Sequence, residues 1–91
     1  MTTLEQLRRQ LDEVDDQIVV LYEKRMSLCR DVGELKASSG KAVLDEKREK
    51  EKLDLVSSKV QDPNNAEGIR ELYKKLMELS RKSQEEIIKN M

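Results

Sequence analysis

One apolar stripe runs through the first 35 residues and constrains the fold more than any other feature of this sequence. Its members recur at steps of three and four residues, with one gap: Leu4, Leu7, Leu11, Val14, Ile18, Leu21, Leu28, Val32 and Leu35. This is the spacing of the buried face of an α-helix. No proline interrupts the segment, and the one glycine within it is tolerable. The stripe therefore predicts a helix over about residues 4–38, roughly 50 Å long at about 1.5 Å per residue.

Two shorter helices are expected to follow the long one. The stretch "SSGK" (38–41) breaks the first pattern, and a second helix is expected from near Asp45 until "QDPNN" (61–65). A third carries its apolar positions from Ile69 to Ile88.

Capping residues mark where two of these helices begin. Thr3 followed by Gln6 fits a capping box for the first helix. The third has two candidates. Asp62 can cap it with a proline in the first turn, or Asn64 can cap it with a glutamate three residues on.

The long helix cannot be covered by two shorter helices of the same chain. Aromatic residues make up 2% of the sequence and charged residues 41%, a composition suited to helices that bury a narrow stripe. A second copy of the chain is the simplest way to bury the remaining apolar surface. We therefore predict an all-α fold, with residues 1–91 as one domain of three helices in an intertwined homodimer.

Composition also excludes several classes of function. The net charge is −1 and aromatic residues are scarce, which argues against nucleic-acid binding. No apolar run approaches the roughly 20 residues that cross a membrane. A single cysteine favours a reducing cytoplasm. The absence of histidine rules out Ser-His and Cys-His nucleophiles and argues against a zinc site.

Polar residues occupy positions where the helical patterns predict apolar ones. The gap in the first stripe falls on Arg25, and related spacings place polar residues on the apolar faces of all three helices. The set comprises Arg25, Lys36, Asp45, Arg48, Glu49, Ser80 and Gln84. Such groups need partners when they face the interior. They could pair with each other as structural salt bridges, or together bind a negatively charged ligand.

Arg8 raises a separate possibility. It stands 17 residues before Arg25, which is roughly 25 Å along the helix. It therefore cannot reach a small ligand held by Arg25 and Lys36 of its own chain. In an antiparallel dimer it could reach the partner's ligand; otherwise it is a solvent-facing charge beside Arg9.

Three motifs, in order and together spanning nearly the whole chain, resemble the all-α (AroQ-type) chorismate mutases. They are "LRRQLDEVDDQIVVLYEKRMSLCRDVGELK", "VLDEKREKEKL" with its D-x-x-R-E pattern, and "ELSRKSQ" with S-x-x-x-Q. The resemblance implies conversion of chorismate to prephenate on the route to phenylalanine and tyrosine. It also implies a homodimer whose two equivalent sites are built from both chains.

The resemblance further implies roles for individual residues. Lys36 and Gln84 match the donors to the ether oxygen of the substrate, and Lys36 also contacts a carboxylate. The substrate-binding positions are Arg25 for a carboxylate, Arg8 from the other protomer, Arg48, Asp45, Glu49 on the ring hydroxyl, and Ser80.

The implied reaction suits this inventory of residues. It is a unimolecular pericyclic rearrangement, so it requires no nucleophile, metal or other cofactor. Arginines on rigid helices can hold a flexible dianion in a reactive shape, and donors at the ether oxygen can stabilise developing charge. Two alternatives stay open: an isochorismate pyruvate lyase on the same fold, and a non-catalytic helical oligomerisation module.

Overall fold

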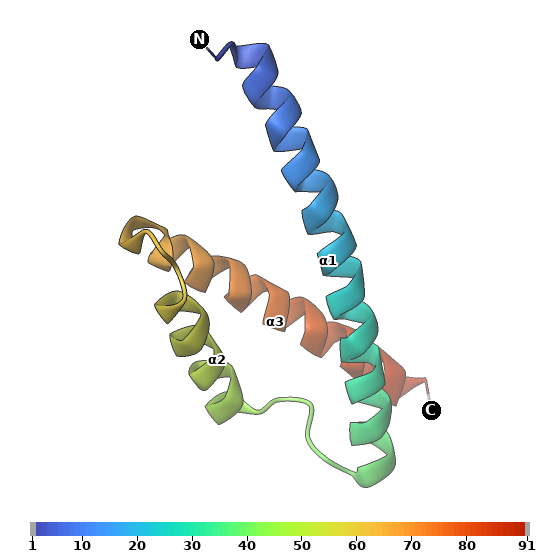
Figure 1. The fold of residues 1–91 in the computed structure, drawn as a ribbon. Coiled ribbons are helices and arrows are strands. Elements are labelled where there is room, and N and C mark those ends of the chain that lie inside the picture. The colour runs from blue at the N-terminus through green and yellow to red at the C-terminus, as the bar shows by residue number, and fades with distance from the viewer. Residues whose placement is uncertain (1, 91) are drawn as a thin grey trace.

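A computed structural model describes residues 2–90, so the two ends of the predicted domain 1–91 lie outside the described residues. The chain is all-α, as predicted, and contains no strand within this range. Its elements are α1 (Leu4–Ser39), α2 (Glu46–Ser58), the short 3₁₀ segment η1 (Pro63–Asn65) and α3 (Ala66–Lys89), as Figure 1 shows.

Local capping interactions define both ends of α1. Thr3 Oγ1 accepts from the Gln6 backbone N–H at 3.2 Å, and Gln6 Oε1 accepts from the Thr3 N–H at 2.9 Å. This is the predicted capping box. At the other end Gly40 adopts a left-handed conformation with φ 71°, and its N–H donates to the Lys36 carbonyl. Glycine carries no steric penalty there, so the helix ends where "SSGK" predicted.

The next two boundaries depend on aspartates. Asp45 caps α2 by accepting from the Arg48 N–H at 3.1 Å. Asp62 accepts from the Asn64 N–H at 3.0 Å and so caps η1, which leads into α3. The alternative that Asn64 is the cap is wrong, because Asn64 lies inside η1. Asn65 precedes α3 without a side-chain capping bond.

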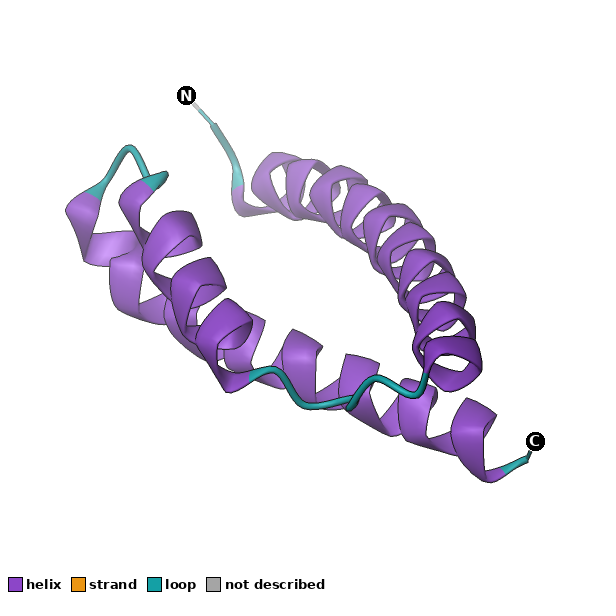
Figure 2. Ribbon diagram, turned by 90° about the horizontal axis from the view of Figure 1, so that it is seen from below, coloured by secondary structure: helices purple, strands orange, loops and turns teal. Residues whose placement is uncertain are grey.

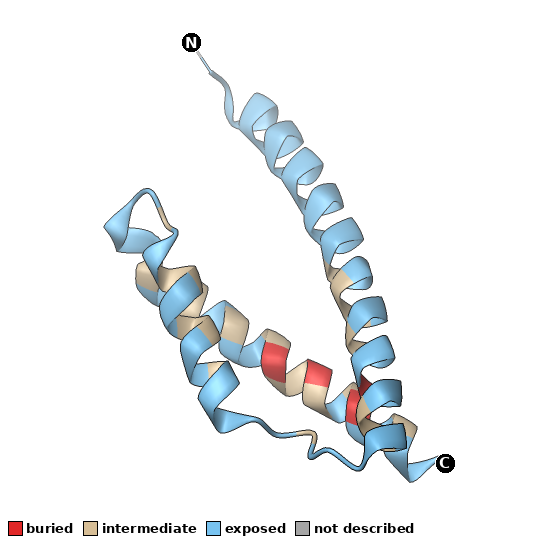
Figure 3. Cartoon of the chain, turned by 60° about the horizontal axis from the view of Figure 1, so that its bottom comes forward, coloured by how far each residue is buried: buried red, intermediate tan, exposed pale blue. Residues whose placement is uncertain are grey.

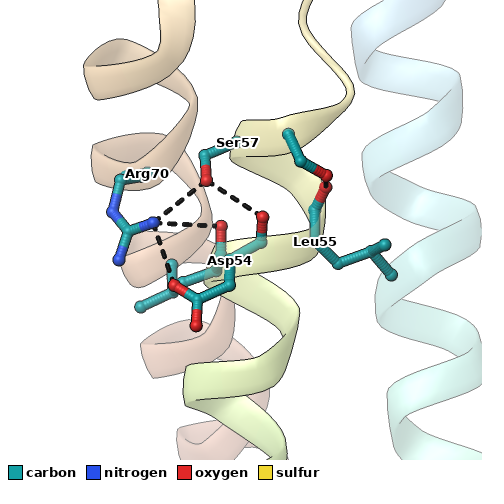
Figure 4. A network of polar contacts seen from close by, with 6 residues as sticks. Asp54, Leu55, Ser57 and Arg70 are labelled. Atoms are coloured by element: carbon teal, nitrogen blue, oxygen red, sulfur yellow. Dashed lines mark hydrogen bonds and ion pairs between the residues drawn. The ribbon is translucent and has the colours of Figure 1, made fainter.

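Helix α3 is the central element, since both α1 and α2 pack against it. Arg70 of α3 ties α2 in place through Nη1, which donates to Asp54 Oδ1 at 3.2 Å and to Ser57 Oγ at 3.0 Å. The same nitrogen donates to the Leu53 carbonyl at 3.4 Å. Figure 4 shows this network between the two helices. It holds α2 alongside α3 in a region where neither helix contributes a large apolar side chain to a buried core.

The N-terminal half of α1 has no partner within the described chain. Figure 1 shows α1 diverging from α3 toward its N-terminus, Figure 2 shows α2 lying alongside α3 with α1 set apart, and Figure 3 shows this half exposed throughout. Leu4 keeps 62% of its surface exposed and Ile18 57%. The radius of gyration is 16.6 Å, whereas a compact domain of this length has about 12 Å. The chain therefore leaves its main apolar surface open to water.

The face of α1 that packs on α3 differs from the predicted stripe. Leu28 and Leu35, two stripe members in the C-terminal half of α1, are exposed although α3 lies nearby. The half-buried or buried residues of this half are instead Tyr22, Cys29 and Gly33 with their helical neighbours. Within one chain the leucines of the stripe are therefore not the contact face, although the stripe member Val32 lines the pocket between the helices.

The buried centre of the chain is unusually polar. Among the described residues, only Gly33, Met77, Ser80 and Gln84 are buried, and two of these four carry polar side chains. Buried polar side chains cost free energy unless they form hydrogen bonds. A chain with so little apolar core places them there at the expense of its own stability. Such a centre is typical of a binding site.

Candidate functional site

The three helices enclose one cleft around this polar centre. Its volume is about 160 Å³, and the loop between α1 and α2 closes one side. All seven polar residues that interrupt the predicted stripes line it: Arg25, Lys36, Asp45, Arg48, Glu49, Ser80 and Gln84. They come from separate helices, so their convergence is a property of the tertiary structure.

Arg25 is held at the cleft wall by α3. Its Nη1 donates to Ser80 Oγ at 2.7 Å, and the Ser80 hydroxyl donates in turn to the Leu76 carbonyl at 2.8 Å. The guanidinium carbon lies 5.8 Å from the centroid of the Tyr73 ring, which adds a cation–π contact. Within the described residues its hydrogen bonds use Nη1 alone, so its remaining N–H groups are available to an anion.

Cys29 lies one helical turn after Arg25 and lines the same cleft. Its Sγ is 3.1 Å from Ser80 Oγ and 3.7 Å from Arg25 Nη1. The thiol therefore packs as a small, weakly polar neighbour of the arginine.

Lys36 is anchored at the other end of the cleft. Its Nζ donates to the Val43 carbonyl at 2.9 Å, which links the last turns of α1 to the loop before α2. An ammonium group carries three donors, so two remain for a ligand. The loop thus orients Lys36 without consuming its hydrogen-bonding capacity.

Three predicted residues lie at the start of α2. Asp45 uses its carboxylate to cap the helix, and Arg48 carries an exposed side chain at the rim of the cleft. Glu49 is half-buried and pairs with Arg81 of α3. Glu49 thus has an ion-pair partner outside the predicted set, and among the described residues no two members of the set form a salt bridge with each other.

Gln84 is as deeply buried as Ser80, with 6% of its surface exposed. Its Oε1 has no hydrogen-bond partner among the described residues. Gly33 faces it from α1: a Cβ at Gly33 would lie 3.0 Å from Gln84 Cγ and 3.2 Å from Gln84 Cα. The close approach of the two helices therefore confines Gln84 beside the cleft with an unsatisfied polar atom.

The cleft is strongly cationic although the whole chain is slightly acidic. Five lysines and arginines and two carboxylates line it, a formal excess of three positive charges in a chain of net charge −1. Such a concentration of charge in a concave site attracts small anions. The described residues contain no cluster of histidine, cysteine or carboxylate side chains able to hold a metal ion.

Sequence reasoning missed two of these cations, Lys52 and Arg81. Arg81 follows Met77 by four residues and precedes Gln84 by three, so its spacing placed it on the cleft face. Lys52 follows Arg48 by four residues. Lys52 also precedes Val56 by four residues, so both cations lie at apolar-face spacing, like the predicted residues, and their sequence signal was overlooked.

Arg8 is the one predicted residue that the described chain does not bring to the cleft. It is exposed on the free N-terminal half of α1. Its predicted role requires a second copy of the chain.

Comparisons with known proteins agree on one family. The family model described as chorismate mutase type II matches residues 7–85. A protein named chorismate mutase from Methanocaldococcus jannaschii is 35% identical over 66 residues, which cover 72% of this chain and 67% of that protein. A 3-dehydroquinate dehydratase from Pyrobaculum aerophilum is 43% identical over 47 residues, 52% of this chain but only 16% of that longer protein.

A solved structure shows the same fold. It is a conserved hypothetical protein from Pyrococcus furiosus, 32% identical in sequence, with a TM-score of 0.74. The similarity covers 92% of this chain and 97% of that one.

No helix in the described range combines the length and apolarity that spanning a membrane requires.

Proposed function

Because the chain belongs to the chorismate mutase type II family and is an isomerase, we propose that it rearranges chorismate to prephenate in the cleft between its three helices. We place this reaction on the route to phenylalanine and tyrosine. The single cysteine favours a cytoplasmic setting.

One observation carries the proposal. Polar residues from three helices converge on a single cleft with an excess of positive charge, and Gln84 there keeps a buried oxygen without a partner. A purely structural oligomerisation module gains nothing from this arrangement, since each buried polar group costs stability. A small dianion that also accepts and donates hydrogen bonds would satisfy it.

The first contribution to rate is conformational restriction. Chorismate is a flexible dianion that must adopt a compact shape before one C–O bond breaks and one C–C bond forms. Arg25, oriented by Ser80, offers N–H groups to one carboxylate, and Arg48 offers another cation at the rim. Holding the reacting carbons together prepays orientational entropy that the free substrate must otherwise lose.

The second contribution is electrostatic. As the C–O bond stretches, negative charge develops on the ether oxygen. We assign Lys36 and Gln84 as the donors to that oxygen, which binds them more strongly in the transition state than in the ground state. Lys36 is suited because the loop carbonyl of Val43 orients it, and Gln84 because helix packing confines it. Glu49 is assigned to the ring hydroxyl, and Asp45 lies close by as the α2 cap.

A homodimer completes the proposal. The stripe on the N-terminal half of α1 is an apolar surface whose exposure to water costs free energy. A second copy of the same helix offers an equivalent apolar surface against which it can pack. Arg8 lies on that half, so dimerisation could deliver it to the partner's cleft. Residues 1–91 then act as one domain, with two sites per dimer.

The decisive experiment is incubation of the purified chain with chorismate, followed by quantification of prephenate. We expect first-order consumption of chorismate with prephenate as the product. Isochorismate is the second substrate to test, with release of pyruvate as the readout. Pyruvate formation without any prephenate would favour the lyase and contradict the proposal.

A further inference from the structure

Arg81 is a cation of the cleft to which the sequence patterns assign no role. Its Nη1 donates to Glu49 Oε1, and the ion pair joins α3 to α2 at the cleft wall. Both side chains are largely sheltered, with 30% of Arg81 and 24% of Glu49 exposed. The other ion pairs of α3 each include a side chain that is more than half exposed. The Arg81–Glu49 pair therefore differs from surface pairs of little energetic weight.

Glu49 on its own would oppose the binding of a dianion. A carboxylate at the wall of a small, partly buried cleft repels the carboxylates of the substrate more strongly than it would in water. Arg81 supplies the compensating charge at the carboxylate itself. The cleft can thereby keep an acidic side chain without losing affinity for an anion.

Arg81 also restrains how Glu49 can act. Among the described residues, the hydrogen bond and the ion pair of Glu49 both involve Oε1, which leaves Oε2 as an acceptor. A guanidinium donates from a rigid planar group, so it restricts the rotation of the carboxylate more than a flexible ammonium does. A restrained acceptor suits a neutral hydroxyl donor on the ligand.

We propose that Arg81 is a positioning residue, which neutralises Glu49 and orients it toward the hydroxyl group of the substrate. This inference rests on the proposed function. It assigns Arg81 no contact with the substrate, so all of its effect passes through Glu49.

The test is a double-mutant cycle with Arg81→Gln, Glu49→Gln and the combined variant, measured with chorismate. We expect Arg81→Gln to raise KM about tenfold, because Glu49 is then an unpaired anion in the cleft, and to lower kcat less than tenfold. In the Glu49→Gln background, Arg81→Gln should change kcat/KM by no more than about threefold, since the group through which it acts is gone.

Arg81→Lys separates charge from orientation. It keeps the positive charge, so KM should stay within about threefold of the wild type, while kcat falls severalfold because the planar donor is lost. Should Arg81→Gln fail to fold, the same cycle run with Arg81→Lys decides the question. Its kcat defect should vanish in the Glu49→Gln background.

Lys82→Gln is the matched control. Lys82 is the next residue on α3, and its side chain is 63% exposed. It pairs with Glu78 and does not line the cleft. The Lys82→Gln variant loses one positive charge, as Arg81→Gln does, and we expect its kcat and KM to equal those of the wild type. Additive losses in the cycle would overturn the proposal, because Arg81 would then contact the substrate directly. Failure of the wild type to rearrange chorismate would overturn the proposed function instead.

Discussion

At the scale of single residues, Gln84 is the most informative side chain. It is buried, it is confined by Gly33, and its Oε1 has no partner among the described residues. We predict that Gln84→Glu is active only when the new carboxyl is protonated, since only that form donates a hydrogen bond to the ether oxygen. Activity should therefore rise as the pH falls through the pKa of that carboxyl.

The measurement is a pH–rate profile of kcat/KM for both proteins. The neutral Gln84 has no proton to lose in this range, so the wild type provides the reference profile. A variant whose profile overlays that of the wild type would remove Gln84 from the donor role.

Lys36 gives a second prediction at this scale. It is the charged donor that we assign to the ether oxygen, and it is already oriented by Val43. Removal of one such donor lowers the rate on the order of 10²–10³. We expect Lys36→Ala to lose kcat by that amount while thermal unfolding stays cooperative. A kcat near that of the wild type would contradict the assignment.

At the scale of helices, the contact between α1 and α3 depends on the absence of a side chain at Gly33. A Cβ there would come within 3.0–3.2 Å of three atoms of Gln84, so the two helices would have to separate by a few tenths of an ångström. Glycine in a helix lowers stability by about 1 kcal/mol relative to alanine. At Gly33 this cost is offset because only glycine allows α1 and α3 to approach so closely.

Gly33→Ala should therefore lower kcat severalfold by shifting Gln84, although alanine favours the helix. Gly68→Ala is the matched control, because a Cβ at Gly68 meets nothing within 4 Å. We expect Gly68→Ala to leave kcat unchanged and to stabilise the fold by about 0.5–1 kcal/mol. Chemical denaturation and steady-state kinetics on both variants measure the two effects. Equal kinetics for the two would show that the contact does not position Gln84.

At the scale of the whole molecule, the exposed apolar stripe is the surface through which we propose that the chain dimerises. Val14 belongs to the stripe, whereas Val20 lies about 120° around the helix from it, and both are exposed in the single chain. We predict that Val14→Asp prevents dimerisation, because a charge in an apolar interface costs several kcal/mol. Val20→Asp makes the same substitution off the stripe and should leave the dimer intact.

Sedimentation equilibrium gives the mass of each variant, and the chorismate assay gives its activity. Monomeric Val14→Asp should lose at least about 100-fold in kcat/KM if Arg8 acts in the partner's cleft. A wild type that sediments as a monomer at micromolar concentration would contradict the predicted dimer.

The helices and their ends could be read from the sequence, because both depend on residues within one or two turns. The steps of three and four residues predicted α1, the Thr3–Gln6 box its start, and Gly40 its end. The candidate site was also largely foreseeable, since polar residues on apolar faces are a local anomaly. Seven of the eight predicted site residues share the cleft, and Arg8 does not.

What the sequence determined by itself was thus the set of helices and the residues that did not fit their apolar faces. Only the tertiary structure decided that α1 meets α3 through Gly33 and Arg25 rather than through the leucines of its stripe, and that Glu49 pairs with Arg81. Both depend on how each helix is rotated and placed against its neighbour. Periodicity along one helix fixes neither quantity, because it describes a face but not the element that will cover it.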